Sequence, residues 1–394
     1  MIVQNISDQF KNLWRTRPTQ LLTGFFKDNE ETLLEKNLTE LSPKLTRRIK
    51  CLVKDLPEPP VYRKAVQEAL MSNLRQWQEN PSIYPNNLVI LTSPIESVAS
   101  LFKGSKQDWQ DEKQIPFSFL QWNTRPIESI TMLMKLKAEL ERQEEHPEVV
   151  LVPDYNHFFL RRIDGFEGIK HLRNTVVKDR SRFWLIGCQS WAWRYFKLGC
   201  QIDSFFNETL SLPVLNGTQL QEWLTPTITQ VKIDFIQRTK DSEQNKDQQK
   251  AQKIYFEKLA NKSGGVASLA LQLFLNSLRY EVTNLSSDDE HIAVRAEEPS
   301  LPDVPDLSFE EQYLLFSLIL HGSLSLPNLS STLEEVEDVV VRLVQNLHRT
   351  QIIEQRDELL RINLIYYPKL RDLLDKNHFM IAKADASYKQ IIFK

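Results

Sequence analysis

Three short runs of almost continuously apolar residues constrain the fold of this 394-residue chain most strongly. They are residues 88–92 (LVILT), 148–153 (EVVLVP) and 182–188 (RFWLIGC). Strands that are apolar on both sides lie in parallel sheets whose two faces are covered. Between the first two runs we expect a helix over 95–102 and a polar connector over 103–114. The alternation of strands and helices predicts an α/β fold around a parallel sheet flanked by helices.

Proline-rich and acidic stretches mark the expected domain boundaries. Residues 56–60 (LPEPP) hold a proline cluster that no helix can run through. Residues 281–306 are rich in Ser, Asp, Glu and Pro, which is typical of a linker. We therefore expect a helical N-terminal segment over 1–60, an α/β domain over 61–235, a small helical lid over 236–283, a linker over 284–306 and a last domain over 307–394.

The last domain has its own order of elements. Apolar spacing predicts helices over residues 309–321 and 333–347. Two strand-like runs, 352–354 and 359–364, flank a turn and predict a hairpin, and a helix follows over 369–375. Two helices, a hairpin and a final helix resemble a winged helix.

The stretch from Ser93 to Ser100 follows the first apolar run and leads into the next helix. A strand, a turn and a helix in this order form the frame of the phosphate-binding loop, G-x-x-x-x-G-K-[ST]. In that frame Ser93 and Val98 stand at the two glycine positions, and Ala99 stands at the lysine position. Only Ser100 matches the motif.

Together with the order of the domains, this loop resembles the AAA+ and STAND-type P-loop ATPases over roughly residues 61–380. The resemblance implies a P-loop NTPase-like sheet, then a lid, then a winged helix. It implies that Ser100 and Asp154 correspond to the two residues that hold Mg²⁺. A vestigial nucleotide site would consist of Ser93, Ser97, Ser100 and Asp154, and Asp154 and Ser100 would bind magnesium only together with ATP or ADP.

The charged groups that such ATPases use for catalysis are missing. Ala99 lacks the ammonium group that bridges the β- and γ-phosphates. Branched Val98 resists the backbone geometry that a glycine adopts. Tyr155 follows Asp154 where active members carry an acid, so no base is evident to polarise an attacking water. The resemblance therefore implies a degenerate Walker A motif and a pseudo-ATPase.

Two further positions of the family are only partly represented. Gln189 or Ser190 follows the third apolar run, where the sensor 1 residue reads the γ-phosphate. Residues 266–269 (VASL) offer no arginine at the sensor 2 position. No catalytic residue is therefore assigned.

Several residues have a structural interpretation beside a functional one. Asp154 can cap the following helix instead of binding a metal, and we favour the cap. His157, Arg161 and Arg162 can form an anion-binding site or, more commonly, a solvated face. An aromatic group can be a ligand platform or, as we favour, core and domain interface. Its members are Trp184, Trp191, Trp193, Tyr195 and Phe196.

Composition narrows the class of protein. The net charge of −3 gives no general attraction to DNA or anionic lipid, and only ten glycines argue against glycine-rich cofactor loops. Three cysteines without C-x-x-C spacing favour a reducing compartment and no zinc site. No run of 18 apolar residues and no signal-peptide layout is present, so we expect a cytoplasmic protein.

Two parts of the sequence suggest DNA or a membrane surface as a partner. A winged helix can bind DNA, but residues 334–338 (EEVED) crowd the helix end that would approach phosphates, and we disfavour DNA. Residues 9–27 interleave aromatic and basic side chains and could contact a membrane surface. Because Pro18 interrupts a single amphipathic helix, we favour packing of this segment on its own domain.

The leading hypothesis is a catalytically inactive, ATPase-derived adaptor or regulatory subunit. It would act through protein partners, in a homo- or hetero-oligomer, without a cofactor. One alternative is a nucleotide-binding switch without efficient hydrolysis, which binds ATP or ADP with Mg²⁺. A second and less favoured alternative is a DNA-associated AAA+ ATPase; if the chain were an enzyme, it would be an ATP hydrolase.

Overall fold

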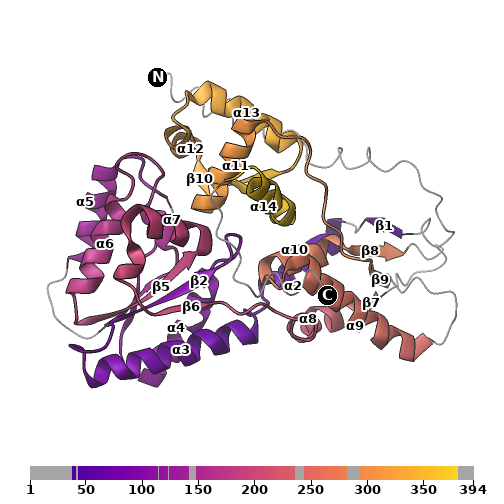
Figure 1. Cartoon of the computed structure of the whole chain (residues 1–394). Coiled ribbons are helices and arrows are strands. Elements are labelled where there is room, and N and C mark those ends of the chain that lie inside the picture. The colour runs from indigo at the N-terminus through magenta and orange to yellow at the C-terminus, as the bar shows by residue number, and fades with distance from the viewer. Residues whose placement is uncertain are drawn as a thin grey trace.

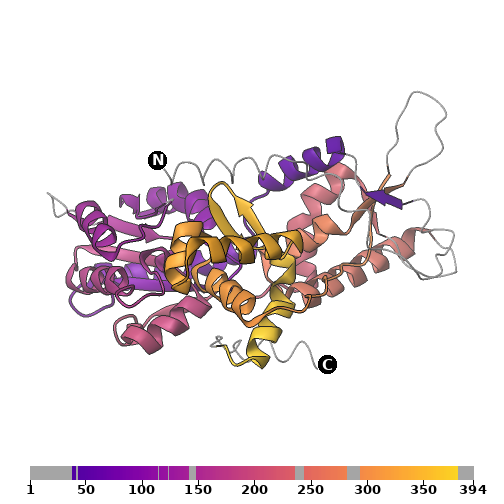
Figure 2. The same cartoon turned by 90° about the horizontal axis from the view of Figure 1, so that it is seen from above.

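The computed structural model describes residues 38–40, 43–113, 115–122, 124–141, 148–235, 244–281 and 293–379. Residues 9–27 lie outside this part of the chain. The described residues form an α/β domain and a lid at the two ends of the molecule, with a C-terminal unit across the middle (Figures 1 and 2). Among the described residues, no helix is long and apolar enough to cross a membrane.

The α/β domain is built on a five-stranded parallel sheet with the strand order β3-β4-β5-β2-β6. The strands are β2 (Asn87–Thr92), β3 (Phe117–Phe119), β4 (Glu148–Val152), β5 (Arg182–Gln189) and β6 (Thr209–Ser211). Every residue of β4 and β5 is buried, as continuous apolar strands require. The predicted α/β fold with a parallel sheet is confirmed.

Helices cover both faces of this sheet (Figure 1). On one face lie α3 (Pro60–Glu79) and α4 (Ala99–Lys113), and on the other lie α5 (Ser129–Leu140), α6 (Glu167–Lys178) and α7 (Ser190–Cys200). Short 3-10 turns, η2 (Tyr155–Phe158) and η3 (Ile202–Ser204), join these elements. Successive side chains alternate across a strand, so Leu88 and Ile90 enter one core and Val89 enters the other.

The expected helix over 95–102 and polar connector over 103–114 are wrong. The helix starts later, at Ala99, and continues to Lys113. Its buried side chains, among them Phe102 and Trp109, recur every three or four residues, and the many polar residues between them form the exposed face.

The unit that we call the lid from here on extends beyond the expected residues 236–283, and it contains the helices α8 (Gly217–Val231), α9 (Gln244–Ser263) and α10 (Ala267–Asn276). It also contains a four-stranded sheet, which was not predicted. The strand order is β1 (Leu38–Glu40), β8 (Leu278–Glu281), β9 (Ala293–Ala296) and β7 (Ile233–Phe235). The N-terminal helix α2 (Pro43–Lys54) packs on α8. A turn at Gly264 and Gly265, both with positive φ, separates α9 from α10.

The C-terminal unit combines helices with a three-stranded antiparallel sheet of order β10-β12-β11. Its elements are α11 (Phe309–His321), β10 (Leu324–Ser325), α12 (Leu326–Leu333), α13 (Glu337–Arg349), β11 (Ile353–Arg356), β12 (Leu359–Ile362), η4 (Leu364–Tyr366) and α14 (Tyr367–Lys376). The predicted start of α13 at residue 333 is wrong, because Glu334 adopts a left-handed conformation that ends α12. Helix α12 itself was not predicted.

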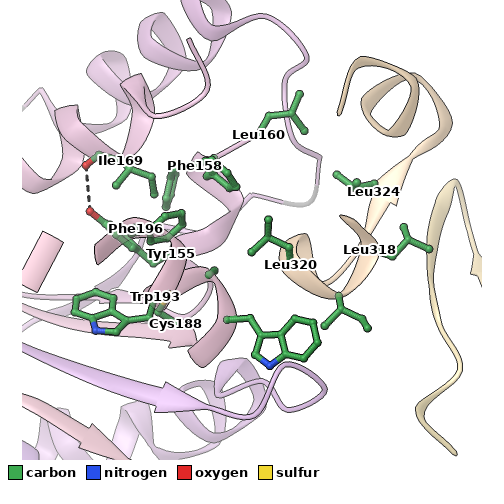
Figure 3. Close-up of a cluster of buried hydrophobic side chains, with 14 of the residues drawn as sticks. Tyr155, Phe158, Leu160, Ile169, Cys188, Trp193, Phe196, Leu318, Leu320 and Leu324 are labelled. Carbon is green, nitrogen blue, oxygen red and sulfur yellow. Dashed lines mark hydrogen bonds between the residues drawn. The ribbon is translucent and has the colours of Figure 1, made fainter. Parts of the chain in front are cut away.

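The C-terminal unit shares a hydrophobic core with the α5–α7 face of the sheet. Figure 3 shows Leu320 of α11 and Leu324 of β10 on the side of the C-terminal unit that faces Leu160 and Cys188 of the α/β domain, whereas Leu318 lies on the other side of α11. The lid instead shares a core with α3, α4 and the opposite face of the sheet. The two faces of the sheet therefore belong to two different cores, one shared with the C-terminal unit and one shared with the lid.

Candidate functional site

The loop of residues 93–98, between β2 and α4, lies at a point where the connections between strands change from one face of the sheet to the other. The helices that follow the neighbouring strands β2 and β5 pack on opposite faces of the sheet. In open α/β sheets, ligands bind at the carboxyl ends of strands at such a switch point. A ligand site is therefore expected at this loop.

The loop makes a tight turn whose polar groups bond within the chain. The Glu96 amide donates to the Ser93 carbonyl at 3.0 Å, and the Thr92 hydroxyl donates to the Glu96 carbonyl at 3.0 Å. Pro94 sits at the second turn position, where its fixed φ fits. None of residues 93–100, all of which the structure describes, has a positive φ. The loop therefore lacks the αR-αL pairs that form an anion-binding nest.

Val98 fills the space under this loop. Its side chain is buried against β5 at Gly187. A Cβ at Gly187 would lie 2.3 Å from Val98 Cγ2 and 2.3 Å from the Pro153 carbonyl oxygen. The absence of a side chain at Gly187 thus makes room for Val98, and the loop is packed into the core by a residue that the phosphate motif does not allow.

The carboxyl group of Glu96 lies against the N-terminus of the lid helix α10. One Glu96 oxygen accepts a hydrogen bond from the Ser268 amide at 3.1 Å, and the Ser268 hydroxyl donates to the Ile95 carbonyl at 2.8 Å. The Ala267 amide donates to the Tyr62 hydroxyl at 3.3 Å. These groups satisfy amides that a helix N-terminus leaves without intrahelical partners, and a carboxylate there interacts favourably with the helix dipole.

Burial raises the pKa of Glu96 to about 7. The Ser268 amide acts in the opposite direction, and the nearby Glu58 carboxyl raises the pKa further. Glu58 has a raised pKa too, because it is desolvated, although a hydrogen bond with the Ser100 hydroxyl lowers it. Two acids thus lie close together beside the loop, where a phosphate group would require positive charge.

The structure brings together two of the predicted site residues. The Ser97 hydroxyl donates to an Asp154 carboxyl oxygen at 3.4 Å and accepts from the Ala99 amide at 3.2 Å. Asp154 occupies the N-cap position of η2, but its side chain makes no capping hydrogen bond. Ser100 bonds instead with Glu58. Ser93 contributes its carbonyl to the turn and lines the neighbouring cleft.

Arg125 supplies the positive charge near Asp154. Its guanidinium donates to the carbonyls of Asn156, His157, His321 and Ser323, at 3.0 to 3.3 Å. Burial lowers the pKa of Arg125 to about 9, while the charge of Asp154 raises it. Arg125 therefore stays charged at neutral pH and joins η2 to the C-terminal unit, and each of its three side-chain nitrogens donates to a backbone carbonyl.

Two family positions beside the site face away from it. The Tyr155 side chain is buried, and its hydroxyl donates to the Ile169 carbonyl at 3.1 Å (Figure 3). The Gln189 side-chain amide donates to the carbonyls of Ile319 and Leu320 in α11, and its oxygen caps α7 at Trp191. Both side chains thus act in packing rather than at a phosphate.

The other residues that raised functional alternatives also connect units. Arg161 contacts the Tyr313 hydroxyl and donates to the Thr332 carbonyl at 2.9 Å, so it bridges to the C-terminal unit. Arg162 pairs with Asp164 at 2.8 Å. The aromatic group is mostly core and interface: Trp184, Trp193 and Phe196 are buried, and Trp191 packs on Phe316 and Tyr367.

A cleft of about 1160 Å³ opens beside the loop, between the three units. Ser93 and Glu96 line it from the loop, Tyr62 from α3, and Lys262 and Gly265 from the lid. Further cations on its walls are Arg194, Lys197, Lys369 and Arg371. Its size exceeds that of most small-molecule sites. No group of His, Cys, Asp and Glu suited to a metal ion occurs among the residues that the structure describes.

Sequence reasoning did not identify Glu96, Glu58, Tyr62 or Arg125 as residues of this region. Glu96 was visible as an acid inside the phosphate-loop frame, which is the one local signal that could have drawn notice. The roles of the others depend on contacts with distant segments, so no local pattern reveals them.

No protein-family model matches the chain, and no curated protein matches its sequence. Solved structures resemble it distantly. The Thermotoga maritima RuvB Holliday junction branch migration motor has a TM-score of 0.33 and 15% identity, covering 78% of this chain and 94% of that one. The Aeropyrum pernix ORC2 protein has a TM-score of 0.36 and 13% identity, covering 86% and 98%.

A third similar chain comes from the E. coli MS115-1 HORMA:CdnC:Trip13 complex, with a TM-score of 0.33, 12% identity, and coverage of 60% of this chain and 83% of that one. Similarities at these scores carry no functional argument. The α/β fold follows from the chain's own sheet, and its function has to be argued from its own residues.

Proposed function

We propose that this chain is a catalytically inactive relative of the AAA+ ATPases that serves as a scaffold for protein partners. The observation that supports this proposal most directly is the hydrogen bond from the Ser268 amide, at the N-terminus of α10, to the Glu96 carboxyl group. A helix N-terminus beside a phosphate loop favours an anion. Here an acid of the chain itself takes that position, so a phosphate would have to displace it.

The surroundings support the same proposal. A displaced Glu96 would leave the phosphate beside Glu58 and Asp154, and residues 93–100 contain no lysine or arginine to compensate. Val98 packs into the core and Gln189 bonds with α11, so neither is free to serve a nucleotide. Rebuilding a phosphate site would therefore require changes in the core as well as in the loop.

Isothermal titration of the full chain with Mg-ATP and with Mg-ADP tests the proposal. We expect no binding heat at millimolar nucleotide, and no difference between the wild type and the Asp154→Ala variant. Micromolar binding, together with ATP turnover that Asp154→Ala abolishes, would contradict the proposal.

A second candidate is a nucleotide-binding switch without hydrolysis, and the cleft beside the loop favours it. The cleft is lined by Tyr62, Ser93 and Gly265 and is large enough for a nucleotide. Ser93, Ser97, Ser100 and Asp154 would then hold the phosphates and a magnesium ion after Glu96 had moved. Saturating ATP or ADP would raise the melting temperature of such a switch; an unchanged value removes this candidate.

The exposed acids before and at the start of α13 favour a protein partner over DNA. Glu334, Glu335, Glu337 and Asp338 are exposed and would repel phosphates. We expect no shift of duplex DNA in a gel titration at low salt. Salt-sensitive binding would instead support the DNA-associated alternative.

A further inference from the structure

Basic side chains from all three units line the cleft beside the loop of residues 93–98. They are Arg194 and Lys197 of α7, Lys262 near the end of α9, and Lys369 and Arg371 of α14. The whole chain has a net charge of −3, so this concentration of positive charge is a local feature. Because a cleft lined by charges of one sign attracts ligands of the opposite sign, this cleft favours an anionic ligand.

These cations are available to a ligand, because their ion pairs lie at the surface. Lys197 Nζ lies 3.6 Å from an Asp203 oxygen, and both side chains are nearly half exposed. Lys369 pairs with Asp303, whose side chain is 99% exposed. Among the residues that the structure describes, no carboxylate pairs with Lys262. Exposed ion pairs contribute less than about 1 kcal/mol, so the carboxylate of a ligand can replace them.

Two acids also line the cleft, and each has a partner within the chain. Asp372 pairs with Arg371 at 2.9 Å, and the Glu96 carboxyl group accepts from the Ser268 amide. The remaining cations outnumber them. The lining therefore keeps an excess of positive charge.

Apolar side chains of the same three units lie between these charges. They are Leu91, Trp191 and Leu212 of the α/β domain, Leu269 of α10 and Tyr367 of α14. An inorganic anion would leave this apolar lining without a complement. A ligand that carries both acidic and apolar groups matches the whole cleft.

Strand β6 forms one edge of the parallel sheet and borders the cleft. Its partner among the described residues is β2, and the Glu208 carbonyl and the Leu212 amide bond to that strand at 2.9 Å. Because backbone groups alternate in direction along a strand, those of Thr209 and Ser211 point to the free edge. Both residues are exposed, and Ser211 also lines the cleft.

This free strand edge favours a peptide among the possible anionic ligands. It offers N–H and C=O groups with which an extended peptide can pair as a further strand. A nucleotide or a nucleic acid has no backbone of this kind and would leave the edge unused. The charges, the apolar lining and the strand edge are matched together only by an acidic and apolar peptide.

We propose that the cleft binds an extended acidic segment of a protein partner, which pairs with the edge of β6. Its carboxylates pair with the cations of α7, α9 and α14, and its apolar side chains pack between them. This inference rests on the proposed scaffold function, but the two fail separately. ATP turnover would contradict the scaffold function, whereas missing peptide binding would contradict this inference alone.

Fluorescence anisotropy of the full chain with a labelled peptide that alternates glutamate and leucine tests the inference. We expect saturable binding that weakens as the salt concentration rises, because exposed charges are screened. A peptide with lysine in place of glutamate should bind at least tenfold more weakly, because its charges are repelled. A peptide with N-methylated backbone amides should also bind at least tenfold more weakly, because it lacks the donors that pair with β6.

Matched variants test the role of the cations. Lys197→Ala combined with Lys262→Ala should weaken binding at least tenfold without lowering the melting temperature, because neither side chain is buried. Lys253→Ala removes an exposed lysine of α9 that does not line the cleft, and should leave binding unchanged. Equal affinities in the two variants, or for the N-methylated and the parent peptide, would overturn the inference. So would binding of oligothymidine or Mg-ATP without binding of the peptide.

Discussion

The α/β domain meets the C-terminal unit and the lid through contacts of different chemistry. At the C-terminal unit, Arg125 donates to the carbonyls of His321 and Ser323, and the neutral ring of His321 is held at both nitrogens. At the lid, a single carboxyl group with a pKa near 7, that of Glu96, caps α10. The first contact is insensitive to pH around neutrality, whereas the second changes its charge there.

The ring of His321 shows why the first contact does not respond to pH near neutrality. Its Nδ1 hydrogen bonds with the Ser317 carbonyl at 2.7 Å, and its Nε2 accepts from the Arg161 amide at 3.0 Å. Burial, together with the charge of Arg125, holds the pKa of His321 well below its ordinary value. The polar contact with the C-terminal unit thus keeps its charge state near neutral pH, whereas the Glu96 contact with the lid changes its charge there.

Removing Arg125 should produce the largest loss of stability. Arg125→Met removes a donor from four backbone carbonyls, of which that of His321 keeps only the Asn156 amide, and breaking such a charged network costs about 3–5 kcal/mol. Urea denaturation measures this loss. Arg63→Met removes an exposed ion pair with Asp108 and should cost less than about 1 kcal/mol. Equal losses in the two variants would show that Arg125 does not hold the units together.

Neutralising Glu96 should stabilise the protein above pH 7. The folded pKa of about 7 lies above the ordinary value of 4.5, so the folded state binds the proton more tightly. Stability from this group is full below about pH 4.5 and is lost as the pH rises to about 7. At pH 8, Glu96→Gln should therefore be more stable than the wild type, by up to about 3 kcal/mol, and Glu68→Gln should be neutral.

Thermal or urea denaturation at several pH values tests this expectation. The difference between Glu96→Gln and the wild type should grow between pH 4.5 and 7 and then stay constant. A constant difference over the whole range would mean that the Glu96 carboxyl group is solvated and does not titrate at the lid.

Shortening Val98 should have a smaller effect. Val98→Ala removes two buried methyl groups over Gly187, which should cost about 2 kcal/mol from lost burial and the remaining cavity. Val336→Ala, at an exposed position, should change the free energy of unfolding by less than about 0.5 kcal/mol. If Val98→Ala were as neutral as its control, the loop would not be anchored by this residue.

The sequence predicts the sheet well because its strands are apolar on both faces. Strands β4 and β5 lie within the predicted runs to within two residues. The lid sheet was missed because its strands are only three or four residues long and β1 pairs with β8, residues 38–40 with 279–281. Such short strands with distant partners have no local signature.

In the candidate site, too, the local features follow from the sequence, whereas the contacts with distant segments do not. The phosphate-loop frame predicts a strand, a turn and a helix around residues 93–100, and the structure has β2 up to Thr92 and α4 from Ala99; Ser97 contacts Asp154. The partner of Glu96 lies 172 residues away in α10, so capping by this acid follows only from the tertiary fold. The side-chain-free position at Gly187, which admits Val98, is equally a property of packing.

The central claim is that a carboxyl group of the chain itself takes the place of a bound anion at the lid helix. Carbon-13 NMR titration of the Glu96 carboxyl group, assigned by comparison with Glu96→Gln, tests it most directly. We predict a pKa of about 7 that millimolar Mg-ATP does not change. A pKa near 4.5, or a resonance that Mg-ATP shifts at micromolar concentration, would contradict the claim.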